Sequence, residues 1–95
     1  MSRELKKQRD KEILKPLVGE TIIIYFREEH SQPKIIFINK IGYMDYGQVN
    51  FRVFNIVDNV YDEDWGMGLL AAKKLVKNKI VTFDEPDLVT KVEIM

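Results

Sequence analysis

Three apolar runs between residues 21 and 57 constrain this chain more than any other feature of its sequence. The runs are Thr21–Arg27, Lys34–Ile41 and Gln48–Val57, and polar, turn-forming residues separate them. They are rich in isoleucine, valine and phenylalanine, which favour strands, and each has the length of a single strand. Because short connections join neighbouring antiparallel strands, the pattern predicts an antiparallel meander.

The third run alternates most regularly between apolar and polar residues. Its inward positions are apolar, and the first outward positions are polar: Gln48, Asn50 and Arg52. Phe54 and Ile56 then place two large apolar groups on the otherwise polar side. We therefore expect something to cover this end of the strand, most simply the second helix or another subunit.

The second run also alternates, but it is apolar on both sides. Strict alternation divides its residues into two sets, which are Ile35, Phe37 and Ile41 on one side and Ile36, Ile38 and Lys40 on the other. In the first run, Ile22, Ile24 and Phe26 fall on one face and Thr21, Ile23, Tyr25 and Arg27 on the other. We therefore expect both faces of that strand to be at least half covered, as in a small barrel or beneath a helix.

A helix is predicted before the meander, over roughly Arg3–Lys15. Ser2 can cap its first turn, and Pro16 closes it because proline disfavours a helical conformation in the preceding residue. The first 15 residues carry six bases and three acids. Two interpretations remain open: a phosphate-contacting arm, or a solvated helix whose charge provides solubility.

A second helix is predicted from Trp65 to Lys77, after an acidic turn at Asp58–Asp64. Acids at its start and lysines at its end would complement the helix dipole, and Asn78 can end it in a left-handed conformation. Two short strands, within Lys79–Phe83 and Leu88–Met95, are expected to close the chain, with Leu88 facing inward.

These elements predict an α+β fold for the 95 residues. We expect one domain over residues 1–95, with an N-terminal helix over 1–15 and a sheet with an inserted helix over 20–95. The sheet is expected to be a bent, five-stranded antiparallel sheet or a partly open small barrel. The inserted helix should lie between strands three and four.

Composition narrows the range of environments and chemistries. The chain has no cysteine, which excludes disulfides and thiolate zinc sites and suits the reducing cytoplasm. No apolar run reaches the roughly 20 residues that a membrane span needs, and the charged N-terminus lacks the apolar centre of a signal peptide. Its abundant isoleucine, lysine and asparagine are typical of AT-rich genomes, including those of bacteria and phages.

The hairpin within Ile41–Phe51 resembles the Sm pattern of an apolar residue, glycine and an aromatic residue, followed by an aspartate turn and an asparagine. The end of the chain, Ile80–Asp84 and Leu88–Ile94, is similar to the strand, turn and strand that close YolD-like proteins. The resemblance implies a small β-barrel. For an Sm-like protein it also implies binding of RNA or single-stranded DNA.

The sequence contains few of the residues that enzyme active sites and metal sites use. His30 is the only histidine, serine occurs only at Ser2 and Ser31, and there is no cysteine nucleophile. The spacing Asp62-x-Asp64-x-Gly66 is similar to the start of a calcium loop, but the later ligands are missing. We therefore expect no enzyme activity, no cofactor and no metal.

Two binding hypotheses remain. The first is a small accessory or regulatory factor that docks onto another protein, with these candidate residues: Phe54, Ile56, Tyr61, Trp65, Asp62 and Asp64. The alternative is a nucleic-acid-binding protein, with these candidates: Lys34, Lys40, Arg52, Tyr25, Tyr43 and Tyr46. A membrane partner is not expected, and a homo-oligomer remains an open alternative.

Overall fold

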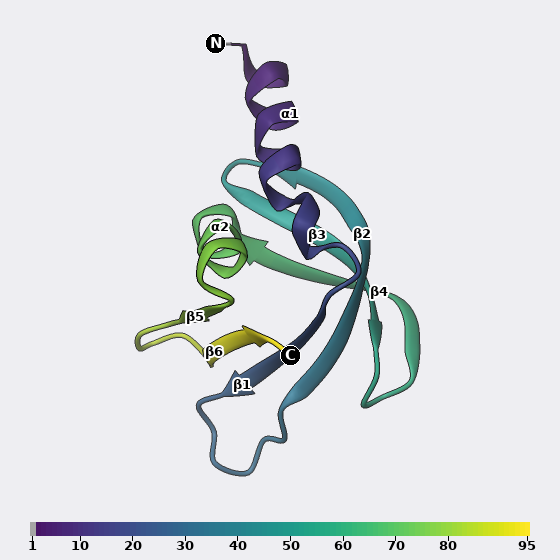
Figure 1. Cartoon of the computed structure of the whole chain (residues 1–95). Helices are drawn as coiled ribbons and strands as arrows, with labels where there is room; N and C mark the ends of the chain where they lie inside the picture. Colours follow the sequence, from purple (N-terminus) through teal and green to yellow (C-terminus); the bar gives the residue numbers. More distant parts are fainter. Residues whose placement is uncertain (1) are drawn as a thin grey trace.

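The meander predicted from the sequence forms the middle of a larger sheet (Figure 1). The structure is a computed structural model that describes residues 2–95, so Met1, which we assigned to the N-terminal helix, lies outside the described residues. The elements in chain order are α1 (Arg3–Leu14), the 3-10 helix η1 (Lys15–Leu17), β1 (Thr21–Phe26), β2 (Lys34–Asp45), β3 (Gln48–Asn55), β4 (Val60–Gly68), α2 (Leu69–Asn78), β5 (Ile80–Thr82) and β6 (Val89–Ile94).

The strands of residues 2–95 form one open antiparallel sheet in the order β4-β3-β2-β1-β6-β5. The last strand returns to pair with the first, so that Ile24 lies opposite Val92. Figure 1 shows β2 and β3 curving strongly, and α2 packs between β4 and β5 and contacts both. The predicted α+β class and antiparallel sheet are confirmed, but the described residues form six strands, not five.

The additional strand is β4, which occupies part of the segment that we predicted as helix. Trp65 lies opposite Phe51 and Gly66 opposite Asn50 in the ladder with β3, so the prediction of helix from Trp65 to Gly68 is wrong. Glycines have low helix propensity, and β3 offers backbone partners along the whole segment. The inserted helix consequently lies between the fourth and fifth strands.

The predicted first helix is confirmed from Arg3 onward. The Ser2 hydroxyl accepts a hydrogen bond of 3.2 Å from the Leu5 backbone N–H, which is the expected N-cap. The α-helical part ends at Leu14, and η1, which contains Pro16, leads into the first strand. Leu14 and Leu17 are fully buried, so this end of the helix is anchored in the core.

The core lies between the concave face of the sheet and the two helices. Its buried apolar members are Leu14, Leu17, Ile22, Ile24, Ile36, Ile38, Val49, Phe51, Val53, Met67, Ala72, Leu75, Val81 and Val92. Leu88, predicted to face inward, is 81% exposed. That prediction is wrong because β6 begins one residue later, after a tight turn, and the β1–β6 register shifts at this end.

The end of α2 gives a first testable prediction. Asn78 is the last helical residue, and Lys79, not Asn78, takes the left-handed conformation, with φ of 66°. Only glycine adopts this conformation without a steric cost, so Lys79→Gly is expected to raise the free energy of unfolding by about 0.5–1 kcal/mol. Urea denaturation would measure the gain, with Lys77→Gly inside the helix as the matched control. The control should lose about 1 kcal/mol, and a loss in both variants would contradict the assignment.

Candidate functional site

Apolar side chains also cover the face of the sheet that points away from the core. The outer-face patch consists of Ile23, Ile35, Phe37, Phe54 and Tyr61. Each of the first four alternates along its strand with fully buried neighbours, so these side chains point to the opposite face. The first four are partly exposed, and Tyr61 is 71% exposed. The helices bury core residues on the other face, so they leave this patch open.

The patch is continuous across four strands. Ile23 on β1 lies opposite Ile35 on β2, and Phe37 lies opposite Phe54 on β3. The Phe54 ring then stacks on that of Tyr61 from β4, with 4.4 Å between the ring centroids and 21° between the planes. Cross-strand aromatic contacts of this kind hold side chains in place without burying them.

Phe54 and Tyr61 were among the predicted protein-binding residues, and the structure brings them together. It does not bring Trp65 to the same place. Trp65 points to the inner face of β4, where its ring stacks on Phe51 at a centroid distance of 5.7 Å. Ile56 is 42% exposed and lies in the turn after β3.

The predicted acidic residues lie in β4 beside the patch, not at a helix start. The Asp64 carboxylate forms an ion pair of 2.9 Å with Arg52 across the strands. Asp62 has a φ of 57° and is exposed, and among residues 2–95 it makes no ion pair within 4 Å. No group of three or more metal-ligating side chains occurs within the described part of the chain.

The cations of the nucleic-acid hypothesis are largely neutralised by neighbours. Lys34 Nζ lies 2.9 Å from a Glu63 carboxylate oxygen, and Arg52 pairs with Asp64. Lys40 is exposed opposite Arg52. Paired cations offer little net positive charge to a phosphate backbone, whose binding depends on releasing counterions.

The three tyrosines of that hypothesis do not share one surface. Tyr25 lies at the end of β1, near the start of β2, where its hydroxyl donates a 3.2 Å hydrogen bond to Glu93. Tyr43 and Tyr46 lie near the far end of the β2–β3 hairpin and are 66% and 85% exposed. Nine residues of β2 separate the two ends, which corresponds to about 30 Å of strand.

Two of these tyrosines are already in contact with cations. The Lys91 ammonium lies over the Tyr25 ring, 4.3 Å from its centroid, and Arg3 lies 4.6 Å from the centroid of Tyr46. Desolvation, followed by the hydrogen bond to Glu93, raises the pKa of the Tyr25 phenol above its ordinary value. Both rings therefore already have a partner on one face.

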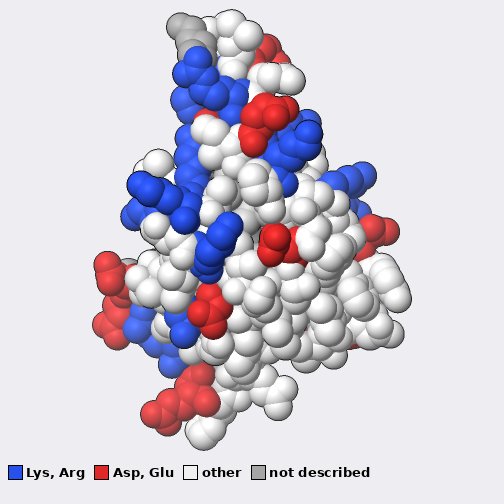
Figure 2. Space-filling view, in the orientation of Figure 1, with Lys and Arg blue, Asp and Glu red and all other residues white. Residues whose placement is uncertain are grey.

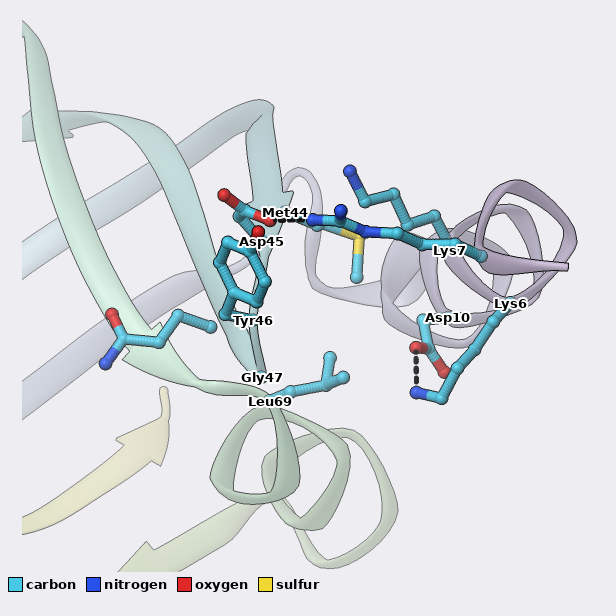
Figure 3. A pocket seen from close by; sticks show the side chains of 10 residues that line it. Lys6, Lys7, Asp10, Met44, Asp45, Tyr46, Gly47 and Leu69 are labelled. Carbon is cyan, nitrogen blue, oxygen red and sulfur yellow. Dashed lines mark hydrogen bonds and ion pairs between the residues drawn. The ribbon is translucent and has the colours of Figure 1, made fainter.

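A buried carboxylate between the helices was not identified from the sequence. Asp10 on α1 is 4% exposed, and its oxygens lie 3.1 Å from Lys6 Nζ and 2.9 Å from Lys73 Nζ of α2. Figure 3 shows Lys6 and Asp10 pointing toward each other beside a hollow between α1 and the β2–β3 turn. The Lys73 hydrogen bond is the main reason why the pKa of Asp10 is lowered. This cluster joins the helices and leaves Asp10 no free oxygen, so we interpret it as structural.

Arg3, at the exposed start of α1, is held in the same region. Its guanidinium forms an ion pair and hydrogen bond with Asp45, drawn in Figure 3, and also stacks on Tyr46.

Figure 2 shows that Lys and Arg gather mainly over α1 and near α2. The uncharged area on the same side of the molecule lies lower, where Figure 1 places β1, the start of β2 and the β3–β4 connection.

No family model, no curated protein and no solved structure matches the chain. The Sm-like and YolD-like resemblances therefore remain hypotheses. No helix formed by residues 2–95 combines the length and the apolar character required to cross a bilayer.

Proposed function

We propose that this chain is a small non-enzymatic binding module that docks onto another protein through the outer-face patch. The observation that supports the proposal is a continuous set of partly exposed apolar side chains on the face opposite the core. Clustered aromatic residues are the side chains that most often dominate binding energy in protein interfaces. Monomeric proteins rarely leave such a patch without a partner.

Charges of both signs border the patch. Asp62 lies next to Tyr61 on β4, Glu93 and Lys91 of β6 lie opposite Ile23 and Tyr25, and Lys40 of β2 lies opposite Arg52. A partner that presents an apolar surface with a rim of both charges would match this surface. We propose an accessory or regulatory protein that acts in the cytoplasm of a bacterium, or of a phage-infected cell.

The geometry favours protein over nucleic acid as the partner. Of the six nucleic-acid candidates, Lys34 and Arg52 are ion-paired and Tyr25 and Tyr46 already contact cations. A nucleic-acid surface would instead need unpaired cations beside open aromatic faces. Binding to RNA or single-stranded DNA is therefore the alternative result that the purification experiment below can detect.

Affinity purification from the source cell, followed by binding measurements with the purified partner, tests this proposal. Phe54→Ser is expected to weaken the measured affinity by at least about tenfold, because it removes the centre of the aromatic contact. Leu70→Ser is the matched control, since Leu70 is an apolar side chain, 75% exposed, on α2. Equal affinities of the two variants would contradict the proposal. So would retention of nucleic acid that falls steeply with salt, since that behaviour marks phosphate binding.

A further inference from the structure

The free edge of β4 carries backbone groups that β3 does not use. The Leu69 N–H donates to the Gly47 carbonyl oxygen at 2.8 Å, in continuation of the β3–β4 ladder. Hydrogen-bonded and non-hydrogen-bonded pairs alternate along an antiparallel ladder. The backbone N–H and C=O groups of Glu63, Trp65 and Met67 therefore bond to β3. Those of Asp64, Gly66 and Gly68 point away from the sheet.

Proteins usually protect exposed strand edges with proline, charged side chains or a covering helix or loop. β4 carries the charged residues Asp62, Glu63 and Asp64, but the stretch after them, Trp65–Gly68, has neither proline nor a charged side chain. Gly66 and Gly68 have no side chain, and a Cβ added to either would meet no atom within 4 Å. Another polypeptide backbone could therefore approach β4 closely at both positions.

An apolar groove adjoins the same edge. Its volume is about 400 Å³, and Trp65 and Met67 of β4 line one side while Phe83, Val89 and Val92 line the other. β3, β2 and β1 separate β4 from β6 in the sheet, and the strong curvature of β2 and β3 in Figure 1 allows residues of β4 and β6 to line the same groove. A strand paired with β4 would direct every second side chain into the groove, because side chains alternate between faces.

One charged residue, Asp87, lies among the described residues that line the groove. Its side chain is exposed, and within residues 2–95 it makes no ion pair within 4 Å. A lysine or arginine in the occupant would complement this carboxylate at the rim.

We propose that β4 and this groove bind an extended peptide segment of another protein as an additional strand. The segment would hydrogen-bond to the free edge at Asp64–Gly68, place alternating apolar side chains in the groove and carry a Lys or Arg beside Asp87. This mode of recognition draws affinity from backbone hydrogen bonds and selectivity from the pockets for alternate side chains. The site is separate from the outer-face patch and does not depend on it.

A second copy of this chain fits the edge less well than such a peptide. In a second copy, the β4 segment that would pair with this edge, residues 62–68, contains three acids and no Lys or Arg that could complement Asp87. The other free edge, β5, has only three residues, Ile80–Thr82, which is shorter than the exposed part of β4. A peptide with a basic residue has neither disadvantage.

The test uses an acetylated, amidated peptide in which leucine and threonine alternate and the last residue is lysine. Amide hydrogen exchange of the full chain, followed by NMR, is expected to slow by at least about tenfold at Gly66 and Gly68 when the peptide saturates. N-methylation of the peptide amides that face β4 should abolish binding. N-methylation of the intervening amides should leave it intact, since those groups point away from the ladder.

Measurements on three variants complete the test. Asp87→Asn should weaken binding of the lysine peptide but not of the same peptide ending in norleucine, whereas Asp84→Asn should change neither. Gly66→Pro removes one outward N–H without removing a bond to β3, so binding should fall while thermal unfolding remains cooperative.

Three results would overturn the proposal. One is unchanged exchange at Gly66 and Gly68 with the peptide at millimolar concentration. Another is equal tolerance of both N-methylation patterns, which would indicate groove binding without strand pairing. The third is protection of these glycines without peptide that grows with protein concentration, which would assign the edge to a second copy of the chain.

Discussion

Phe51→Ala is expected to lower the free energy of unfolding by about 3–5 kcal/mol, the usual cost of truncating a buried phenylalanine. Phe51 is fully buried between β3 and the helices and contacts the ring of Trp65. Removing its ring leaves a cavity that a rigid sheet cannot close. Phe54→Ala, three residues later on the same strand, removes an equal volume from the outer face, so it should cost less than about 1.5 kcal/mol.

Urea denaturation monitored by circular dichroism measures both variants, and the midpoint multiplied by the slope gives each free energy. The comparison is internal, because the two phenylalanines share a strand and differ in the face to which they point. Similar losses in the two variants would mean that the faces of β3 are assigned wrongly, and with them the outer-face patch. If Phe51→Ala does not fold, Phe51→Leu gives a milder test, with an expected loss of about 1 kcal/mol.

Much of the fold could be predicted because the local residue pattern alone identifies the first three strands. In β3, alternation alone identifies the buried set, and the cap at Ser2 identifies the start of α1. The fourth strand has no such pattern. Its sequence, from Val60 to Gly68, combines three acids with two glycines, and both residue types disfavour strands. It becomes a strand because β3 supplies hydrogen-bond partners, which is a tertiary effect.

The faces of β2 show a second limit of sequence patterns. Strict alternation grouped Ile41 with Ile35 and Phe37, but Ile41 packs against the core and lies opposite Phe51. Register shifts in the β2–β3 ladder, one between Ile38 and Lys40, turn the following residues over. An irregularity of one residue reverses every later assignment in a strand, and nothing in the apolar pattern marks it.

The outer-face patch could be predicted only in part. The broken alternation at Phe54 correctly indicated an apolar group on the polar face of β3. Ile23, Ile35 and Phe37 could not be singled out, because both faces of their strands are apolar and strand order decides which face meets the helices. Trp65 was placed with Phe54 because a helix was assumed there; in a strand paired with Phe51 it must share the inner face.

The contact between α1 and α2 depends on the ion pair between Asp10 and Lys73, which the sequence does not reveal. Substitution of Asp10 is therefore expected to have the second large effect on stability. Asp10→Asn is expected to lower the free energy of unfolding at pH 7 by about 1–2 kcal/mol, since it weakens two charge-assisted hydrogen bonds to lysines that remain partly solvated. Lys6 and Lys73 are 64% and 31% exposed, so water can stabilise them once the carboxylate is gone.

This loss should depend on pH in a defined direction. Hydrogen bonds to lysine hold the pKa of Asp10 below its ordinary value of 3.8 in the folded chain. The unfolded chain therefore binds the proton first as pH falls, so the contribution of Asp10 is complete above that value and is lost as pH falls through the folded pKa. The free-energy difference between the original chain and Asp10→Asn should thus be constant near neutral pH and shrink below about pH 4.

Urea denaturation at a series of pH values from neutral to acidic would measure this difference. Asp84→Asn is the control, because Asp84 is exposed and makes no ion pair among residues 2–95; its difference from the original chain should stay near zero. A loss in Asp10→Asn that persists undiminished in acid would show that shape, not charge, makes Asp10 important. No loss at neutral pH would mean that α1 and α2 are held together by apolar contacts alone, through Leu14 and its neighbours in the core.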